Sequence, residues 1–198
     1  MWLSSFNESL GSKRLMLENM KIAIISDTHG NVANFKKAVR WLNKENIKLI
    51  LHAGDIGSPE SLKESLEEFR GKLLGVFGNM DKDFKILIDE YDKISKVKIK
   101  ENTFETEIDG KRIAITHFPA EAKKLAQSVN PSTGSGSRYD LVFYGHTHRA
   151  WDEKVMVPAG GSCHMINPGE LAGQFYKPTF AVYDTETNNL ELKILEKI

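Results

Sequence analysis

Five short, continuous apolar runs constrain the fold of this 198-residue chain most strongly. They are KIAIIS at 21–26, KLILH at 48–52, KLLGVF at 72–77, RIAIT at 112–116 and YDLVFY at 139–144. Continuous rather than alternating apolar character indicates strands that are covered on both faces. The runs therefore predict an α/β fold with buried strands.

Helical stretches separate the first three runs. Residues 31–45 place Val32, Phe35 and Val39 at helical spacing, and residues 58–69 begin with a Ser-Pro pair that is typical of a helix start. The order β-α-β-α-β predicts parallel strands joined by right-handed crossovers.

The second half of the chain is richer in strands. Residues 95–100, 103–108 and 111–116 predict a meander, with a hairpin turn at Asp109-Gly110. Residues 179–184 and 190–195 predict a closing hairpin. We therefore expect two packed sheets with helices outside. The Gly- and Ser-rich residues 131–137 form either a border of a substrate site or a plain surface connector.

Side chains that bind metals follow each of the five runs. They are Asp27, His29, Asp55, Asn79, His117, His146 and His148. In open α/β sheets, ligands bind beyond the carboxyl ends of the strands, so we expect these side chains to meet at one rim. Within the pairs 27/29 and 146/148, a spacing of two in an extended segment turns both side chains the same way.

Carboxylate, imidazole and amide groups suit manganese, iron, zinc or nickel better than calcium. Seven ligands exceed the needs of one tetrahedral ion, whereas two ions that share Asp55 use them all. Two divalent ions, two carboxylates and a bridging hydroxide leave a net charge of about +1, which attracts anions. Ions roughly 3.5–4 Å apart can activate a water molecule and hold phosphate oxygens.

Other polar residues near the runs are expected to have structural roles rather than to bind a metal. His52 is expected in a supporting or core role rather than as a ligand. Cys163 and His164 are expected in packed or surface positions, and Asp81 either caps a helix or supports the metal ligands. The glycines before Asp55, Asn79 and His146 suit tight turns.

The composition excludes several classes of function. Lys and Arg balance Asp and Glu at 27 each, so no overall basic field favours strong nucleic-acid binding. The single cysteine excludes an internal disulfide and predicts a cytoplasmic location. No apolar run approaches membrane-spanning length. Residues 1–19 lack the pattern of a signal peptide and predict a poorly ordered extension, followed by one domain at 20–198.

The motifs SDTHGN, GD, GNMD, TH and GHTH, in this order between Asp27 and His148, resemble the calcineurin-like metallophosphoesterase superfamily. INPGE at 166–170 is similar to a further motif of its compact phosphodiesterase branch, which includes a protein-binding retromer subunit. The resemblance implies a four-layer α/β/β/α sandwich of two mixed sheets with flanking helices. It also implies that one ion is held by Asp27, His29 and His148, that the other is held by Asn79, His117 and His146, and that Asp55 bridges them.

The function implied by the resemblance is a metal-dependent phosphodiesterase. A hydroxide bridging two divalent ions, with manganese expected first, would attack small phosphate diesters in line. Asp55, Asn79 and His117 are the expected catalytic residues, and Asn31 and Arg149 the expected phosphate contacts. A phosphomonoesterase acting on a nucleotide or phosphoprotein is an alternative, and a protein-binding scaffold is another. The complete ligand set favours an enzyme, and the sequence leaves a homo-oligomer open.

Two positions depart from the family pattern. Many members carry a histidine after the Gly-Asn pair, thought to protonate the leaving group, where this chain has Met80. Without that acid we expect a modest catalyst that is fastest on aryl diesters. His117 is followed by Phe118 and Pro119, where relatives often have Gly and His, so the surroundings of the second ion are expected to differ.

Overall fold

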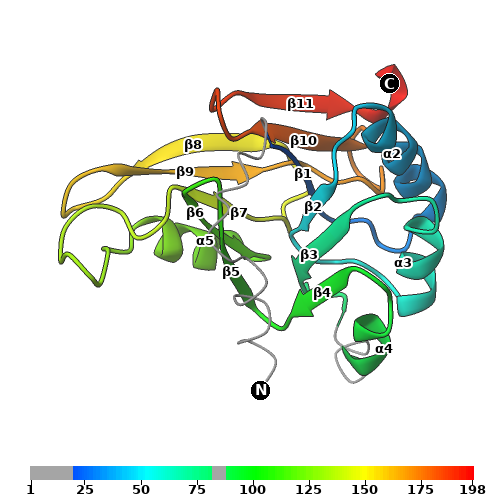
Figure 1. Cartoon of the computed structure of the whole chain (residues 1–198), viewed down its shortest axis with the longest axis horizontal. Coiled ribbons are helices and arrows are strands. Elements are labelled where there is room, and N and C mark those ends of the chain that lie inside the picture. The colour runs from blue at the N-terminus through cyan, green and yellow to red at the C-terminus, as the bar shows by residue number, and fades with distance from the viewer. Residues whose placement is uncertain (1–19, 82–87) are drawn as a thin grey trace, which may run out of the picture.

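The structure is a computed structural model that describes residues 20–81 and 88–198. Helices and strands alternate in the first half, and strands dominate the second (Figure 1). The first half contains β1 (Lys21–Ile25), α2 (Val32–Lys44), β2 (Leu49–His52), α3 (Pro59–Ser65), β3 (Lys72–Val76), α4 (Ile88–Asp92) and β4 (Val97–Lys100). The second contains β5 (Thr103–Ile108), β6 (Lys111–Thr116), α5 (Pro119–Ala126), β7 (Leu141–Phe143), β8 (Trp151–Met156), β9 (Ser162–Asn167), β10 (Thr179–Asp184), β11 (Leu190–Ile194) and the short helix η2 (Leu195–Lys197). The predicted extension at 1–19 lies outside the described residues.

The strands form two mixed sheets. The six-stranded sheet has the order β11-β10-β1-β2-β3-β4, and the five-stranded sheet has the order β5-β6-β7-β9-β8. Neighbours from β1 to β4 pair in parallel, whereas β10 is antiparallel to β1 and β11. In the other sheet β6, β7 and β9 run parallel, with antiparallel β5 and β8 at the edges.

Three apolar clusters separate four layers, as the sequence predicts. Phe35 and Leu42 of α2 pack with residues of α3, α4 and the six-stranded sheet. Ile24 of β1 and Phe143 of β7 lie in the cluster between the two sheets. Ala122 and Ala126 of α5 pack on the other face of the five-stranded sheet. Both sheets are therefore covered on both faces, which explains the continuous apolar runs.

The predicted meander of β4, β5 and β6 is wrong, because β4 belongs to the six-stranded sheet. It pairs in parallel with β3, and its buried Val97 and Ile99 join the helix-side cluster. The link at Glu101-Asn102 contains no residue with a positive φ, so it lacks the geometry of a two-residue hairpin turn. The chain instead crosses to the other sheet, where Phe104 faces the core between the sheets.

The two predicted hairpins are confirmed. Asp109 and Gly110, with φ values of 48° and 74°, join β5 to β6 in the left-handed geometry that favours close reversal. The second hairpin joins β10 to β11 and includes Asn188 at φ 58°. The sequence interpretation did not identify α4, α5, β8 or β9. The exposed, polar β8 and the eight-residue α5 have no strong apolar period.

The predicted helices are present with different lengths. Helix α2 fills the predicted range between its caps, Asn31 and Glu45. Helix α3 starts as expected, since Ser58 Oγ accepts the N–H of Ser61, but it ends at Ser65 rather than at residue 69. Beyond it, turn-type hydrogen bonds bring Phe69 back into the core, which shortens the helix.

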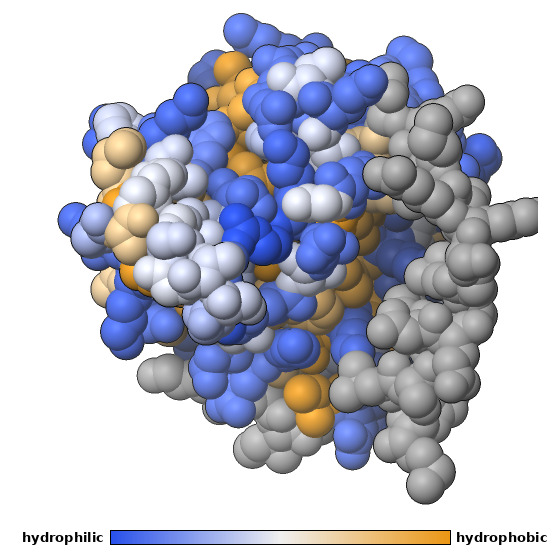
Figure 2. Space-filling view, turned by 60° about the vertical axis from the view of Figure 1, so that its left-hand side comes forward, coloured by the Kyte–Doolittle hydropathy of each residue, from blue (hydrophilic) through white to orange (hydrophobic). Residues whose placement is uncertain are grey.

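The face of the molecule shown in Figure 2 is mostly hydrophilic, with hydrophobic residues showing at several places between the hydrophilic ones. Within residues 20–81 and 88–198, no helix combines the length and apolar character that a membrane crossing requires.

Candidate metal centre

The seven predicted ligands lie in loops that follow the carboxyl ends of β1, β2, β3, β6 and β7. Asp27, His29, Asp55 and His148 form one group, in which one potential ligand atom of each residue lies within 4.8 Å of the others. His148 Nε2 is 3.2 Å from His29 Nε2 and 3.3 Å from Asp27 Oδ1. A carboxylate and two imidazoles that converge in this way fit a divalent cation.

Asn79, His117 and His146 form a second group beside the first. Asn79 Oδ1 is 2.8 Å from His146 Nδ1 and 3.0 Å from His117 Nε2. An amide oxygen and two imidazole nitrogens are directed at one another, which is the donor set predicted for the other ion. The structure thus brings all seven residues together.

Asp55 stands between the two groups. Its Oδ2 lies 3.9 Å from His29 Nε2 and 3.5 Å from His117 Nε2. Its Oδ1 accepts the backbone N–H of Met80 at 2.8 Å. One carboxylate oxygen is therefore fixed by the backbone, while the other faces both groups, as a bridging ligand requires.

Hydrogen bonds behind the ligands fix the orientation of two imidazoles. His117 Nδ1 lies 2.8 Å from the carbonyl oxygen of Ala53 and donates to it, so a cation would be bound through Nε2. His148 Nδ1 lies 3.1 Å from Glu170 Oε2, so a cation would likewise be bound through its Nε2. Such partners set the tautomer of a ligating histidine and raise its basicity.

Glu170 is a supporting residue that the sequence interpretation placed in a motif without giving it a role. It is fully buried and accepts the N–H groups of Gln174, Phe175 and Tyr176 as well as contacting His148. Burial raises the pKa of this carboxyl, but the three N–H groups and His148 outweigh burial and hold the pKa below its usual value. Gly169-Glu170 after β9 repeats the strand-Gly-carboxylate pattern of Gly54-Asp55, and this was the available signal.

Asp81 supports the loops after β2 and β3 rather than a metal. Its carboxylate accepts the N–H groups of Ile56, Gly57 and Gly78. These bonds tie the loop of Asp55 to the loop of Asn79. Of the two interpretations of Asp81, the supporting role is the one that these contacts favour.

His52 is buried and supports the same loops. The N–H of Gly54 donates to its Nδ1, so the proton lies on Nε2 and faces Thr28 Oγ1 at 3.1 Å. The Thr28 hydroxyl in turn donates to the carbonyl oxygen of Ile56 at 2.8 Å. Burial, together with the nearby His117, lowers the pKa of His52 to about 3, so the ring is neutral. The expected supporting role is confirmed.

Five of the seven predicted ligands have left-handed backbone geometry: Asp27, His29, Asp55, His146 and His148 have φ between 43° and 69°. The expected extended segments at 27–29 and 146–148 are therefore wrong, although both side chains of each pair still reach the site. Residues other than glycine seldom adopt this geometry, and such strain gathers at functional sites.

The glycines before the ligands make room for carboxylates and their partners. A Cβ at Gly78 would lie 2.0 Å from Asp55 Oδ1, and one at Gly145 would lie 1.9 Å from Ser26 Oγ. Ser26 Oγ donates to Asp27 Oδ2 at 2.6 Å. A side chain at either position would displace a ligand carboxylate.

Burial shapes the charge of the metal-free site. It raises the pKa of Asp27 to about 6, and it lowers the pKa of His29 and His146. Burial also acts to raise the pKa of Asp55, but the hydrogen bond and charge of His117 outweigh it and leave that pKa below its usual value. A divalent cation would favour the ionised form of both carboxylates.

The two predicted phosphate contacts lie at different exposures. Asn31 caps α2, with Oδ1 accepting the N–H of Asn34 and Nδ2 donating to the carbonyl oxygen of Ala172. Arg149 is exposed, directly after the ligand His148. A phosphate contact by either residue stays a prediction.

Cys163 and His164 lie away from the ligands. Cys163 is buried against α5, and burial raises the pKa of its thiol to about 12. His164 Nε2 lies 2.8 Å from Asp152 Oδ2 on the neighbouring strand. The expected packed and surface positions are confirmed.

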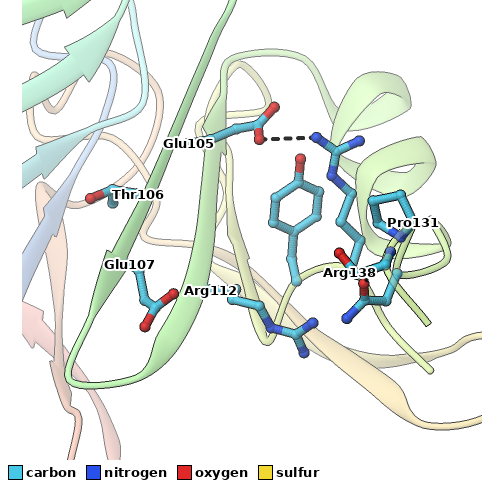
Figure 3. Close-up of a pocket in the computed structure, with 9 residues that line it drawn as sticks. Glu105, Thr106, Glu107, Arg112, Pro131 and Arg138 are labelled. Carbon is cyan, nitrogen blue, oxygen red and sulfur yellow. Dashed lines mark hydrogen bonds and ion pairs between the residues drawn. The ribbon is translucent and has the colours of Figure 1, made fainter. Parts of the chain in front are cut away.

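The segment at 131–137 lies at the other end of the five-stranded sheet. Pro131 and Ser132 line a hollow of about 410 Å³ together with Arg112, near the start of β6, and Tyr139, just before β7. Arg138 and Glu105 also line this hollow and face each other in Figure 3, with Arg138 Nη2 and Glu105 Oε2 3.1 Å apart. The ligands follow the opposite ends of β6 and β7, so the segment does not border the candidate metal centre.

Known proteins with this arrangement identify the family. Residues 20–188 match the model of the calcineurin-like phosphoesterase superfamily domain. The chain belongs to this superfamily. It is 33% identical over 178 residues to phosphodiesterase MJ0936 of Methanocaldococcus jannaschii, covering 89% of this chain and 100% of that protein.

Two solved structures share the fold of this chain. The structure of a novel archaeal phosphodiesterase has a TM-score of 0.72 and 30% identity, over 88% of this chain and 99% of its own. Vacuolar protein sorting 29 of Cryptosporidium parvum has a TM-score of 0.55 and 16% identity, over 88% and 96% of the two chains. The second likeness concerns the fold alone.

Proposed function

We propose that this phosphoesterase-family protein is a metal-dependent phosphodiesterase. The position of Asp55 carries the proposal, because its Oδ2 faces both ligand groups while Met80 fixes its Oδ1. The whole-length relative named as a phosphodiesterase supports it.

The ligand groups fit two divalent ions. Asp27, His29 and His148 would hold one, Asn79, His117 and His146 the other, and Asp55 both. Manganese is the first candidate, with nickel, iron and zinc as alternatives. Bound ions of this kind supply Lewis acidity and an activated water for in-line displacement at phosphorus.

The chain's own residues orient this chemistry. Asp55, Asn79 and His117 are the proposed catalytic residues, since they meet where the two ligand groups join. The exposed Arg149 would contact phosphate oxygens, and Asn31 would do so through the second N–H of its Nδ2, whose other N–H donates to the carbonyl oxygen of Ala172. Met80 supplies no proton at its position, so aryl diesters with good leaving groups should react fastest.

Two alternatives remain distinct from this proposal. A phosphomonoesterase would use the same ligands on a nucleotide or phosphoprotein. A protein-binding scaffold would not need seven ligands with buried hydrogen-bond support behind them. The support given to His117 and His148 favours an enzyme.

We also propose that residues 20–198 form one domain and that the protein works in the cytoplasm on small phosphate esters. The single cysteine is consistent with that compartment. Strong nucleic-acid binding is not expected of a chain with no net charge.

The test is to remove metal, restore manganese, nickel, zinc or magnesium separately, and assay bis(p-nitrophenyl) phosphate beside p-nitrophenyl phosphate. Diester hydrolysis should return with metal and be lost in Asp55→Asn and His117→Ala. Asp152→Asn, which removes only a surface partner of His164, serves as the matched control. A preference for the monoester would assign a phosphatase. Two ions bound without any turnover would assign a scaffold.

A further inference from the structure

Large apolar side chains are exposed beside the metal ligands. Met80 is 63% exposed, Phe118 44% and Phe175 74%. Each is next to a ligand, either in the chain or by ring contact. Exposed apolar groups that gather at a polar site commonly mark a surface that binds a ligand.

Phe118 lies against the second ligand group. Its ring centroid is 5.1 Å from that of His117 and 5.0 Å from that of His146, with interplanar angles of 75° and 62°. Phe118 also forms the N-terminal boundary of α5, whose Ala122 and Ala126 are buried. The start of α5 thus anchors the backbone of Phe118, and its ring lies beside the proposed second ion.

Phe175 lies against the first ligand group. Its ring centroid is 5.1 Å from that of His148, at 67°. Glu170 accepts the N–H of Phe175 and contacts His148 as well, and the N–H of Ala172 donates to the carbonyl oxygen of Asp27 at 3.0 Å. The loop that carries Phe175 is therefore attached to two ligands of the proposed first ion.

We propose that Phe118 and Phe175 determine specificity by packing against aromatic ester groups of a phosphate diester. The proposal rests on the proposed phosphodiesterase function and narrows its substrate class to diesters with an aryl group or a nucleobase. A diester carries two ester groups on its phosphorus, and each ligand group has one phenyl ring beside it. Aromatic groups gain from packing on exposed rings, whereas a methyl ester has no ring to offer.

The test begins with binding, which needs no turnover. Diphenyl phosphate and dimethyl phosphate are titrated into the manganese-loaded protein by calorimetry. Wild type should bind diphenyl phosphate more tightly, and Phe118→Ala and Phe175→Ala should each weaken it about three- to tenfold. The affinity of both variants for dimethyl phosphate should stay within about twofold of the wild-type affinity. An unchanged diphenyl-to-dimethyl ratio in both variants would overturn the proposal.

Two further variants separate ring recognition from other causes. Phe175→Leu keeps an apolar side chain and should retain part of the preference. Met156→Ala removes an equally exposed apolar side chain from the far end of the β8–β9 hairpin and should leave both affinities unchanged. Manganese titration of each variant should show an unaltered metal site. A tenfold loss of metal affinity in Phe118→Ala and Phe175→Ala would assign the rings to ligand positioning and overturn their role in specificity.

Turnover then separates this inference from the proposed function. Methyl and phenyl esters of p-nitrophenyl phosphate share one leaving group, so the Phe variants should raise KM for the phenyl ester and leave kcat near its original value. No turnover by wild type, with the diphenyl preference intact, would reject the phosphodiesterase and keep aromatic recognition. If wild type and the Phe variants turned over both esters with the same preference for the phenyl ester, aromatic recognition by Phe118 and Phe175 would be rejected and the phosphodiesterase function retained.

Discussion

Two buried carboxylates without a proposed metal contact hold the ligand residues in place. Glu170 joins His148 to the loop at 174–176, and Asp81 joins the loop of Asp55 to the loop of Asn79. Each accepts several backbone N–H groups in the interior, where an unpaired carboxylate would be costly.

Glu170→Gln should weaken binding of the first ion about tenfold to a hundredfold. The variant keeps the size of the side chain but replaces one acceptor oxygen by an NH₂ group, which donates and does not accept, so the hydrogen bonds of that oxygen are lost. Metal titration measures the loss. Glu196→Gln, at an exposed residue paired with Lys177, is the control. Equal metal affinity in the two variants would contradict the supporting role of Glu170.

The convergence of the seven proposed ligands could be predicted from sequence because each follows a recognisable apolar run. Asp81 and Glu170 gave weaker signals, because a buried carboxylate that binds backbone N–H groups looks the same in sequence as a surface one. Their roles depend on which loops meet in space. The left-handed backbone of the ligands was likewise hidden, since residues such as His146 usually avoid it.

Among the elements, the turn between β5 and β6 offers a direct test of backbone geometry. Gly110 has a φ of 74°, and an added Cβ would meet no atom within 4 Å. Gly110→Ala should therefore lower the free energy of unfolding by about 1–2 kcal/mol through backbone strain alone. Urea unfolding measures this change. Gly110→Asn should lower the free energy of unfolding less than Gly110→Ala does, because asparagine tolerates left-handed geometry. An equal decrease in the two variants would contradict this explanation.

The order of the elements from β1 to β3 and the two hairpins follow from sequence, whereas sheet membership does not. Val97 and Ile99 of β4 alternate with exposed residues, as a meander strand would. The partner strand decides which sheet β4 joins. Strand β4 pairs with β3, and its buried side chains lie in the same apolar cluster as Tyr91 of α4. Strand β8 was missed because its residues are largely exposed and polar, and only its pairing with β9 marks it as a strand.

At the scale of the whole molecule, bound metal should stabilise the fold. Manganese at a hundredfold excess over its Kd should add about 2.7 kcal/mol per independent site to the free energy of unfolding at pH 7.5. Thermal unfolding with and without manganese measures this. Asp55→Asn should lose the effect and Asp152→Asn should retain it. An equal rise in Tm in both variants would contradict the proposed ligand set.

The same stabilisation should decrease as pH falls through about 6. Burial raises the pKa of Asp27 to about 6, above its usual value, so below that pH the metal-free protein holds a proton that a cation must displace. Metal-induced changes in Tm at pH 7.5 and 5.5 give the comparison. If manganese raised Tm more at pH 5.5 than at pH 7.5, the predicted direction of the pH dependence would be wrong.

Strand β1 has β10 as one of its two neighbours, with Lys21 opposite Asp184 in the pairing. Strand β1 thus acquires both of its partners only when β10 is present. During synthesis on the ribosome, the early βαβ segment emerges with one side of β1 still open. Completion of the six-stranded sheet must therefore follow the emergence of β10 and β11.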